Sequence, residues 1–237
     1  MRAVAKGMAT PQFPYWLHAL SIVSLILGLA CAIVIAIHQR SHPPKMAVMQ
    51  WVWPLAALFG SVIWLALHFR AQRADEDVPM WLSVAKGASH CGAGCTLGDI
   101  IAEWLAFAFP AIAVWLGWHT VFPEKTFAVW ILDYVLAFGI GIAFQYWAIV
   151  PMRDLSFGKG VTEAVKADFL SIGAWQVGMY GLMAAGQFLW FRPAYGDIAE
   201  VASPEFWFLM QIAMLGGFVT AYPVNWWLVR AGIKERM

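Results

Sequence analysis

A stretch of fifteen residues, 89–103, concentrates the side chains of this sequence that can do chemistry against an apolar background. Two cysteines and two carboxylates of this stretch are spaced four residues apart. On a helix they would lie on nearly the same face, which shifts gradually around the helix axis, with a histidine at its edge. Thiolate and imidazole bind copper(I) and zinc, whereas carboxylates bind harder cations or protons. The stretch therefore predicts a metal site with the ligands His90, Cys91, Cys95, Asp99 and Glu103.

A packing role explains the same cysteines in another way. The nearby Gly92, Gly94 and Gly98 would let helices approach closely in lipid, and cysteine often behaves as a small buried hydrophobe. Asp99 and Glu103 favour a function, because carboxyl groups in an apolar run are costly unless they face a cavity or a partner. Since glycine weakens helices, the cysteines are expected either on a helix or on a partly unwound or re-entrant turn.

The composition is that of an integral membrane protein. Of the 237 residues, 62% are hydrophobic and 12% are charged, whereas a soluble domain carries about 25% charged residues. A formal net charge of +1 without a Lys/Arg run argues against a nucleic-acid partner. Three cysteines imply no disulfide framework.

Six apolar runs are long enough to cross a bilayer core of about 30 Å, which takes about 20 helical residues. The first run is too long for a signal-peptide core of about 7–15 residues, so we expect a retained span. All six should be helices, because a helix satisfies its own backbone hydrogen bonds in lipid. The runs are Tyr15–Ile37, Met46–Phe69, Leu97–Trp118, Phe127–Val150, Phe169–Phe191 and Phe206–Val229.

The predicted fold is all-α and polytopic, with about six transmembrane helices. It consists of an N-terminal two-helix membrane hairpin (residues 1–70), a cytoplasmic connection with a surface helix and the His-Cys turn (71–96), and a four-helix membrane domain (97–237). With a cytoplasmic N-terminus, eleven Lys and Arg residues face inward and four face outward, which by the positive-inside rule places both termini in the cytoplasm. The inward residues are Arg2, Lys6, Arg70, Arg73, Lys86, Arg153, Lys159, Lys166, Arg230, Lys234 and Arg236, and the outward ones are Arg40, Lys45, Lys125 and Arg192.

Further polar and thioether side chains lie at membrane depth. An acid such as Asp133 inside a span is a functional candidate by default. Met179, Met183 and Gln187 share a helix face that could pass a soft ion, although methionines at this spacing also fit core packing and Asp168 also fits a helix N-terminus. The predicted pathway comprises Asp133, Gln145, Asp168, Met179, Met183, Gln187, Met214 and Asn225.

Two segments resemble the bacterial membrane-protein family DUF4396, a domain of unknown function. They are His90-Cys-Gly-Ala-Gly-Cys-Thr-Leu-Gly-Asp99 and the ending Pro223-Val-Asn-Trp-Trp-Leu-Val-Arg-Ala-Gly-Ile-Lys-Glu235. The resemblance covers residues 79–237. It implies a four-helix membrane domain in which the His-Cys turn and the Asn-Trp ending meet on the cytoplasmic side, and it brings no ligand or activity with it.

The functional hypothesis is a bacterial inner-membrane protein that binds copper(I) or zinc at the cytoplasmic mouth of the third span and moves it outward. The sequence has no phosphate-binding loop, nucleophile elbow, zinc-protease motif or dinucleotide fingerprint, so we expect no nucleotide and no ATP-driven pumping, and a metal-binding or transport protein is favoured over an enzyme. The expected partners are the lipid bilayer, a metal chaperone or periplasmic metal protein, and a second copy of the chain. A membrane thiol redox protein using Cys91 and Cys95, and a structural accessory subunit, remain open as alternatives.

Overall fold

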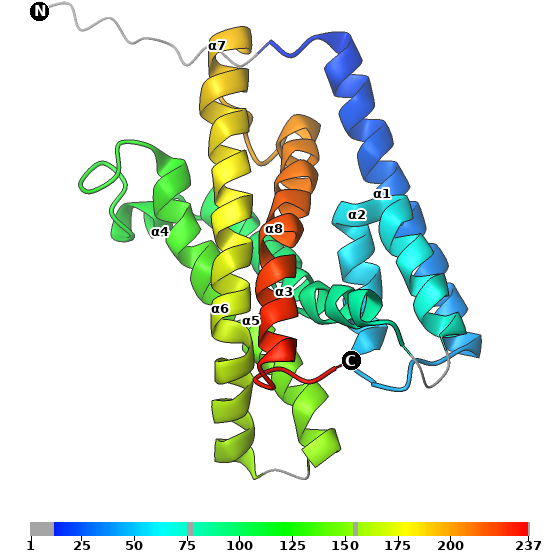
Figure 1. Cartoon of the computed structure of the whole chain (residues 1–237). Helices are drawn as coiled ribbons and strands as arrows, with labels where there is room; N and C mark the ends of the chain where they lie inside the picture. The colour runs from blue at the N-terminus through cyan, green and yellow to red at the C-terminus, as the bar shows by residue number, and fades with distance from the viewer. Residues whose placement is uncertain (1–11, 75–77, 154–155, 237) are drawn as a thin grey trace, which may run out of the picture.

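A computed structural model describes residues 12–74, 78–153 and 156–236, without the side chains of residues 151–153. Arg2, Lys6 and the acidic run at 75–77 lie outside these residues. The described elements are all helices, which confirms the predicted fold class (Figure 1). They are α1 (Tyr15–Ser41), α2 (Met49–Arg73), α3 (Met80–Ala108), α4 (Ala111–Trp115), α5 (Lys125–Arg153), α6 (Phe157–Ala184), the π-helix η1 (Ala185–Phe191), α7 (Arg192–Tyr195) and α8 (Pro204–Arg230).

Five of the described helices, α1, α2, α3, α5 and α8, are long and apolar enough to cross a membrane. The remaining predicted run, Phe169–Phe191, lies partly in α6 and partly in η1, which continues α6 without a break. The protein is therefore a polytopic helical membrane protein.

The helix α3 differs from its predicted extent. The predicted run began at Leu97, but α3 begins at Met80, directly after Pro79, and ends before Pro110. The expected surface helix, the His-Cys turn and the boundary at 96/97 thus all lie within one continuous helix. The reason is that Ser89, His90 and their polar neighbours lower the hydropathy of this segment while their side chains are buried between helices.

The helix α2 folds back on itself instead of crossing once. Its backbone breaks at Ser61, where φ is 44° and ψ is −123°. Both ends of α2 lie next to the last turns of α1. At the first end, Gln39 Nε2 donates to Met49 O at 3.3 Å, and near the second end, ring nitrogens of His38 and His68 lie 3.1 Å apart. The bend lies beside Gly28, half way along α1. We call residues 49–73 the re-entrant hairpin.

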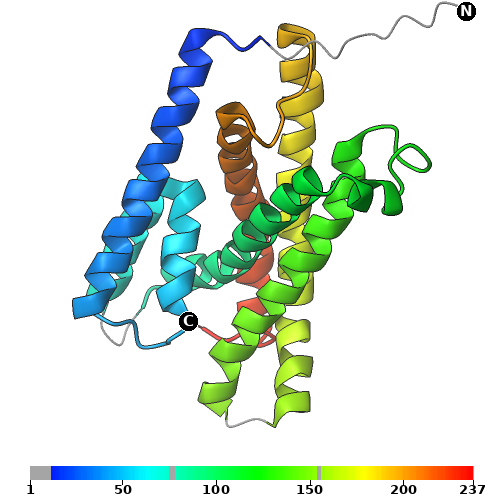
Figure 2. The same cartoon turned by 180° about the vertical axis from the view of Figure 1, so that it is seen from behind.

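This fold-back determines which helix ends lie together. His18, near the start of α1, lies 2.7 Å from Glu205, at the start of α8, so α1 and α8 run in the same direction. Figures 1 and 2 show α1 and α8 both running away from the Tyr15 end of the bundle. The first residue of α1 and the last residue of α8, Arg230, therefore lie at opposite ends. The prediction of two cytoplasmic termini counted the hairpin as a full crossing.

Small residues allow α3 to lie deep among the other helices. An added Cβ at Gly94 would lie 2.7 Å from Gly141 Cα, and one at Gly98 would lie 2.5 Å from Ala137 N, so α3 and α5 run antiparallel in near backbone contact. The same register, continued by one turn, sets Ala102 opposite Asp133. The small residues thus bring the carboxylates of α3 and α5 close together.

Candidate functional site

A buried polar cluster surrounds Cys91 at the Arg230 end of the bundle. Its Sγ lies 2.8 Å from Ser171 Oγ and 3.5 Å from Asp168 Oδ1, both on α6. The Asn225 amide, on α8, donates to Ser171 Oγ at 2.6 Å. The predicted site residues Cys91, Asp168 and Asn225 therefore meet, as the resemblance implied for the His-Cys segment and the Asn-Trp ending.

The fifth member of this cluster is Lys234, which the sequence analysis did not single out as a site residue. Its Nζ donates to Asp168 Oδ1 at 2.6 Å, to Asn225 Oδ1 at 2.8 Å and to Cys91 Sγ at 3.5 Å. Burial disfavours its charge, but the neighbouring Asp168 carboxylate and Cys91 thiol hold the pKa of Lys234 above its ordinary value. The cluster therefore pairs the buried positive charge of Lys234 with the buried negative charge of Asp168 at the Arg230 end of the bundle.

The turn after α8 explains how Lys234 reaches this position. Gly232 has a φ of +69°, a left-handed conformation that glycine adopts without a Cβ clash. The chain then folds back, and the amides of Ile233 and Lys234 donate to Leu228 O at 3.0 and 3.2 Å. The only signal in the sequence is a glycine and a lysine just past the end of an apolar helix.

A second set of buried acids lies further along α3 and on α5. Asp99 and Asp133 are 1% and 0% exposed, and none of their four carboxyl oxygens has a hydrogen-bond partner in the described part of the chain. Glu103, one turn beyond Asp99, is 5% exposed. Glu103 and Asp99 lie within electrostatic range of Asp133, and Lys125 lies within electrostatic range of Glu103 from the Tyr15 end. We call these three buried acids, Asp99, Glu103 and Asp133, the carboxylate lane.

One acid of the carboxylate lane, Asp99, lines a cavity of ≈ 180 Å³ at the bend of the re-entrant hairpin. Leu58 and Phe59 line it from the hairpin, Asp99 from α3, and Met210 and Met214 from α8. Asp99 is the one acid among the described residues that line it, and the other walls are largely apolar. A mostly apolar lining with a few polar groups is typical of ligand sites, and at ≈ 180 Å³ this cavity is smaller than the about 300–1,000 Å³ of pockets for drug-sized ligands.

The break in α2 also places backbone carbonyl groups at the same cavity. A break in a helix leaves carbonyl groups without their helical partners. One of these, Leu58 O, accepts a hydrogen bond of 2.6 Å from the side-chain amide of Gln211, which also lines the cavity. The carbonyl end of the first half-helix lies at this point and favours a cation.

The predicted metal ligands do not converge on one point. His90 turns away from Cys91, and its Nε2 lies 2.9 Å from Met49 Sδ on the hairpin. Within the described ranges, no group of three or more His, Cys, Asp or Glu side chains is placed to hold a metal ion. Cys95 is a free, fully buried thiol. A metal site made by these five residues stays a prediction.

The remaining pathway residues divide into packing and polar positions. Met179 and Met183 are 1% exposed, belong to the same hydrophobic core as Met210 and Met214, and do not line the cavity, which fits the packing alternative. Gln187 holds the loop before α8, because its amide bonds both the carbonyl and the amide of Ala199 at 3.0 and 2.8 Å. Gln145 is fully buried, and its amide has no partner among the described residues. Met214 is the predicted thioether that reaches the cavity.

Comparison with known proteins gives one match. A family model described as a domain of unknown function, DUF4396, matches residues 80–234. No curated protein and no solved structure matches the chain. The matched range begins at α3 and includes Lys234, so it contains both the Cys91 cluster and the carboxylate lane.

Proposed function

The chain belongs to the DUF4396 family, and we propose that it exchanges a soft monovalent cation for protons across a membrane. The observation that carries the proposal is Asp99, a buried carboxyl group with no hydrogen-bond partner among the described residues, on the wall of a cavity at the tip of a half-membrane hairpin. Ionisable groups at membrane depth are costly, and they mark ion and proton pathways. Broken helices that meet at the midplane are the usual binding elements of transporters.

The chemistry of the cavity favours a soft, weakly hydrated ion. Hard divalent ions take six or more oxygen ligands, whereas this cavity offers one carboxylate beside the thioethers of Met210 and Met214. Thioethers select copper(I). Copper(I), the ion predicted from the sequence, thus remains the proposed cargo, but its site moves from the His-Cys segment to the Asp99 cavity.

Protons would balance the charge. Copper(I) that binds at Asp99 displaces the proton of the carboxylic acid, so one positive charge leaves for each one that enters. The proton passes to one of the two other acids of the carboxylate lane, Asp133 or Glu103. The reverse exchange resets the site, and no nucleotide is needed.

We place the protein in the bacterial inner membrane with its Arg230 end in the cytoplasm. Of the twelve Lys and Arg residues whose side chains are described, ten lie at the Arg230 end and two at the Tyr15 end, which fits the positive-inside rule. In this orientation α1 starts outside, the C-terminus is cytoplasmic and the Cys91 cluster closes the inner mouth. The ten are Arg40, Lys45, Arg70, Arg73, Lys86, Lys159, Lys166, Arg230, Lys234 and Arg236, and the two are Lys125 and Arg192.

Flux measurements in sealed proteoliposomes test the proposal. Copper(I), kept reduced, is added outside, and an enclosed pH-sensitive dye reports protons while the enclosed copper is measured by mass spectrometry. Parent protein should take up copper and release protons in equal amounts. Asp99→Asn should lower both fluxes at least tenfold, because an amide cannot exchange a proton for a cation.

A matched pair of methionine variants separates binding from packing. Met210→Leu/Met214→Leu removes the cavity thioethers and should lower copper uptake at least tenfold. Met179→Leu/Met183→Leu makes the same change at two buried core positions of α6 and should keep it. Copper uptake by Asp99→Asn at the parent rate, or uptake without proton release, would contradict the proposal.

A further inference from the structure

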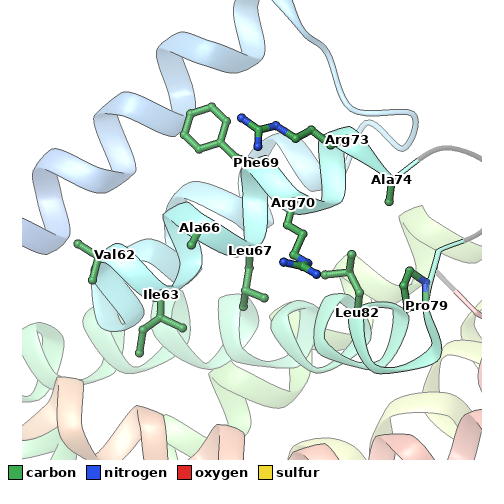
Figure 3. Close-up of a pocket in the computed structure, with 10 residues that line it drawn as sticks. All are labelled: Val62, Ile63, Ala66, Leu67, Phe69, Arg70, Arg73, Ala74, Pro79 and Leu82. Atoms are coloured by element: carbon green, nitrogen blue, oxygen red, sulfur yellow. The ribbon is translucent and has the colours of Figure 1, made fainter.

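A groove of ≈ 1000 Å³ lies on the outer flank of the protein, between the returning half of the re-entrant hairpin and the start of α3. Figure 3 shows its lining residues, which come from α2, the segment that follows it and the first turn of α3. Val62 and Ile63, near the bend, are each 53% exposed. Arg70 and Arg73 lie toward the other end of the helix. The groove is therefore apolar at one end and cationic at the other.

The length of the groove matches one leaflet of a bilayer. Val62 and Arg73 are eleven residues apart on a helix that rises about 1.5 Å per residue, which gives about 16 Å. Half of a hydrocarbon core of about 30 Å is about 15 Å. The apolar end thus lies near the membrane midplane when the arginines lie at the level of the headgroups.

The two arginines are available to an anionic ligand. Neither forms an ion pair with another described residue, and both are exposed. The Arg70 guanidinium lies over the Trp81 ring, with Cζ 5.3 Å from the ring centroid, which orients its planar fork. Arginine forks bind phosphate oxygens in pairs.

We propose that this groove binds one anionic phospholipid of the leaflet at the Arg230 end. Its phosphate binds the Arg70 fork, Arg73 adds positive charge at the same end of the groove, and an acyl chain lies along Val62, Ile63 and Ala66. Basic pockets between membrane helices on the cytoplasmic side are typical sites for anionic lipid headgroups. A partner helix would cover both leaflets, whereas this groove ends at the Ser61 bend. The proposal does not depend on cation transport.

Lipid titration of the detergent-purified full chain tests this inference. Phosphatidylglycerol, cardiolipin and phosphatidylcholine are added separately, and thermal unfolding is followed. Phosphatidylglycerol and cardiolipin should raise the unfolding temperature at lipid concentrations at least tenfold lower than phosphatidylcholine. Glycerol phosphate, a headgroup without acyl chains, should have no effect at those concentrations.

Two variants address the two ends of the groove. Arg70→Gln/Arg73→Gln should raise the concentration of phosphatidylglycerol needed for half of the effect at least tenfold, and Lys159→Gln/Arg230→Gln, which removes two exposed cations from the same end of the bundle, should leave it unchanged. Ala66→Trp fills the apolar end without removing an arginine and should weaken the effect similarly, so a poorly folded arginine variant does not prevent the test. An equal effect of phosphatidylcholine or of glycerol phosphate, or an unchanged response of both groove variants, would overturn the inference.

Discussion

Lys234 Nζ lies 2.6 Å from Asp168 Oδ1, and neither side chain is exposed. The pair joins the tail after α8 to α6, and Cys91 of α3 lies within 3.5 Å of both atoms. Three helices that are far apart in the sequence are therefore fixed at one point. In the proposed orientation this point closes the cytoplasmic mouth.

Removing one member of this pair should destabilise the protein strongly. Lys234→Met leaves the buried Asp168 without its cation, and breaking a buried ion pair in this way costs about 3–5 kcal/mol. Lys234→Met/Asp168→Leu, which removes both charges, should recover much of that loss. Denaturant unfolding in detergent measures both. Lys166→Met is the matched control, because Lys166 is 62% exposed in its pair with Glu163 and should change stability by less than about 0.5 kcal/mol.

The same pair predicts how stability depends on alkaline pH. A lysine whose pKa is higher in the folded state binds its proton more tightly there, so folding gains stability at every pH below the ordinary lysine pKa of about 10.4. This contribution is lost as pH rises through the raised folded pKa. The unfolding free energy of the parent should thus fall more steeply above about pH 10.5 than that of Lys234→Met. Parallel curves would show that the Lys234 charge does not contribute.

The break in α2 should be relieved by glycine. A non-glycine residue at the backbone angles of Ser61 is strained by about 1–3 kcal/mol, and glycine has no Cβ to clash there. We expect Ser61→Gly to raise the free energy of unfolding by about 1 kcal/mol and Ser61→Val to lower it. Ala66→Gly, on the same half-helix with ordinary helical geometry, should instead cost about 1 kcal/mol. A stabilising Ala66→Gly or a destabilising Ser61→Gly would count against the fold-back.

The hydropathy of the chain predicted helices well but not the path of α2. A sum over the run Met46–Phe69 cannot detect one residue with positive φ, and the only local cue is Gly60 before Ser61. The start of α3 was placed 17 residues too late, because a polar helix face that packs inward has the same hydropathy as one that faces water. The direction of each helix in the bundle depends on contacts between distant residues, which spacing does not contain.

The arrangement of the candidate site also depends on contacts between distant residues, which the spacing of residues does not contain. Residues four apart on a helix drift by about 40° per step, so Cys91 faces α6 while Asp99 faces the cavity, two turns further on. The predicted stripe of metal ligands lies along α3, but its two ends contact different helices. Ser171 and Lys234 complete the Cys91 cluster through tertiary contacts, 80 and 143 residues away in sequence.

The close crossing of α3 and α5 should not tolerate a side chain at Gly98. Its Cβ would lie 2.5 Å from the backbone nitrogen of Ala137, which cannot move without displacing α5. We expect Gly98→Val to destabilise the protein by about 3 kcal/mol or more and to separate Asp99 from Asp133. Gly139→Ala, where an added Cβ meets nothing within 4 Å, should be neutral or slightly stabilising. Unfolding of the two variants under one condition gives the comparison, and equal stabilities would exclude this packing.

Metal content decides between the site predicted from the sequence and the site at the cavity. Purified parent protein, reduced and loaded anaerobically with copper(I) or zinc, is compared by mass spectrometry with Cys91→Ser/Cys95→Ser and with Met210→Leu/Met214→Leu. The thiol of Cys91 is already engaged by Ser171 and Lys234, whereas the cavity keeps an unpaired carboxyl group. We therefore expect one copper per chain in the parent and in the cysteine variant, and a loss of at least tenfold in the methionine variant.

The opposite pattern would also be informative. Copper that disappears in the cysteine variant and persists in the methionine variant would establish the ligands predicted from the sequence and exclude the cavity. Zinc in place of copper would remove the role of the thioethers, because zinc prefers nitrogen, thiolate and carboxylate ligands. No metal in any sample would contradict both sites and favour thiol redox chemistry, which requires the Cβ atoms of Cys91 and Cys95 to approach to about 3.5–4.5 Å, or a packing role.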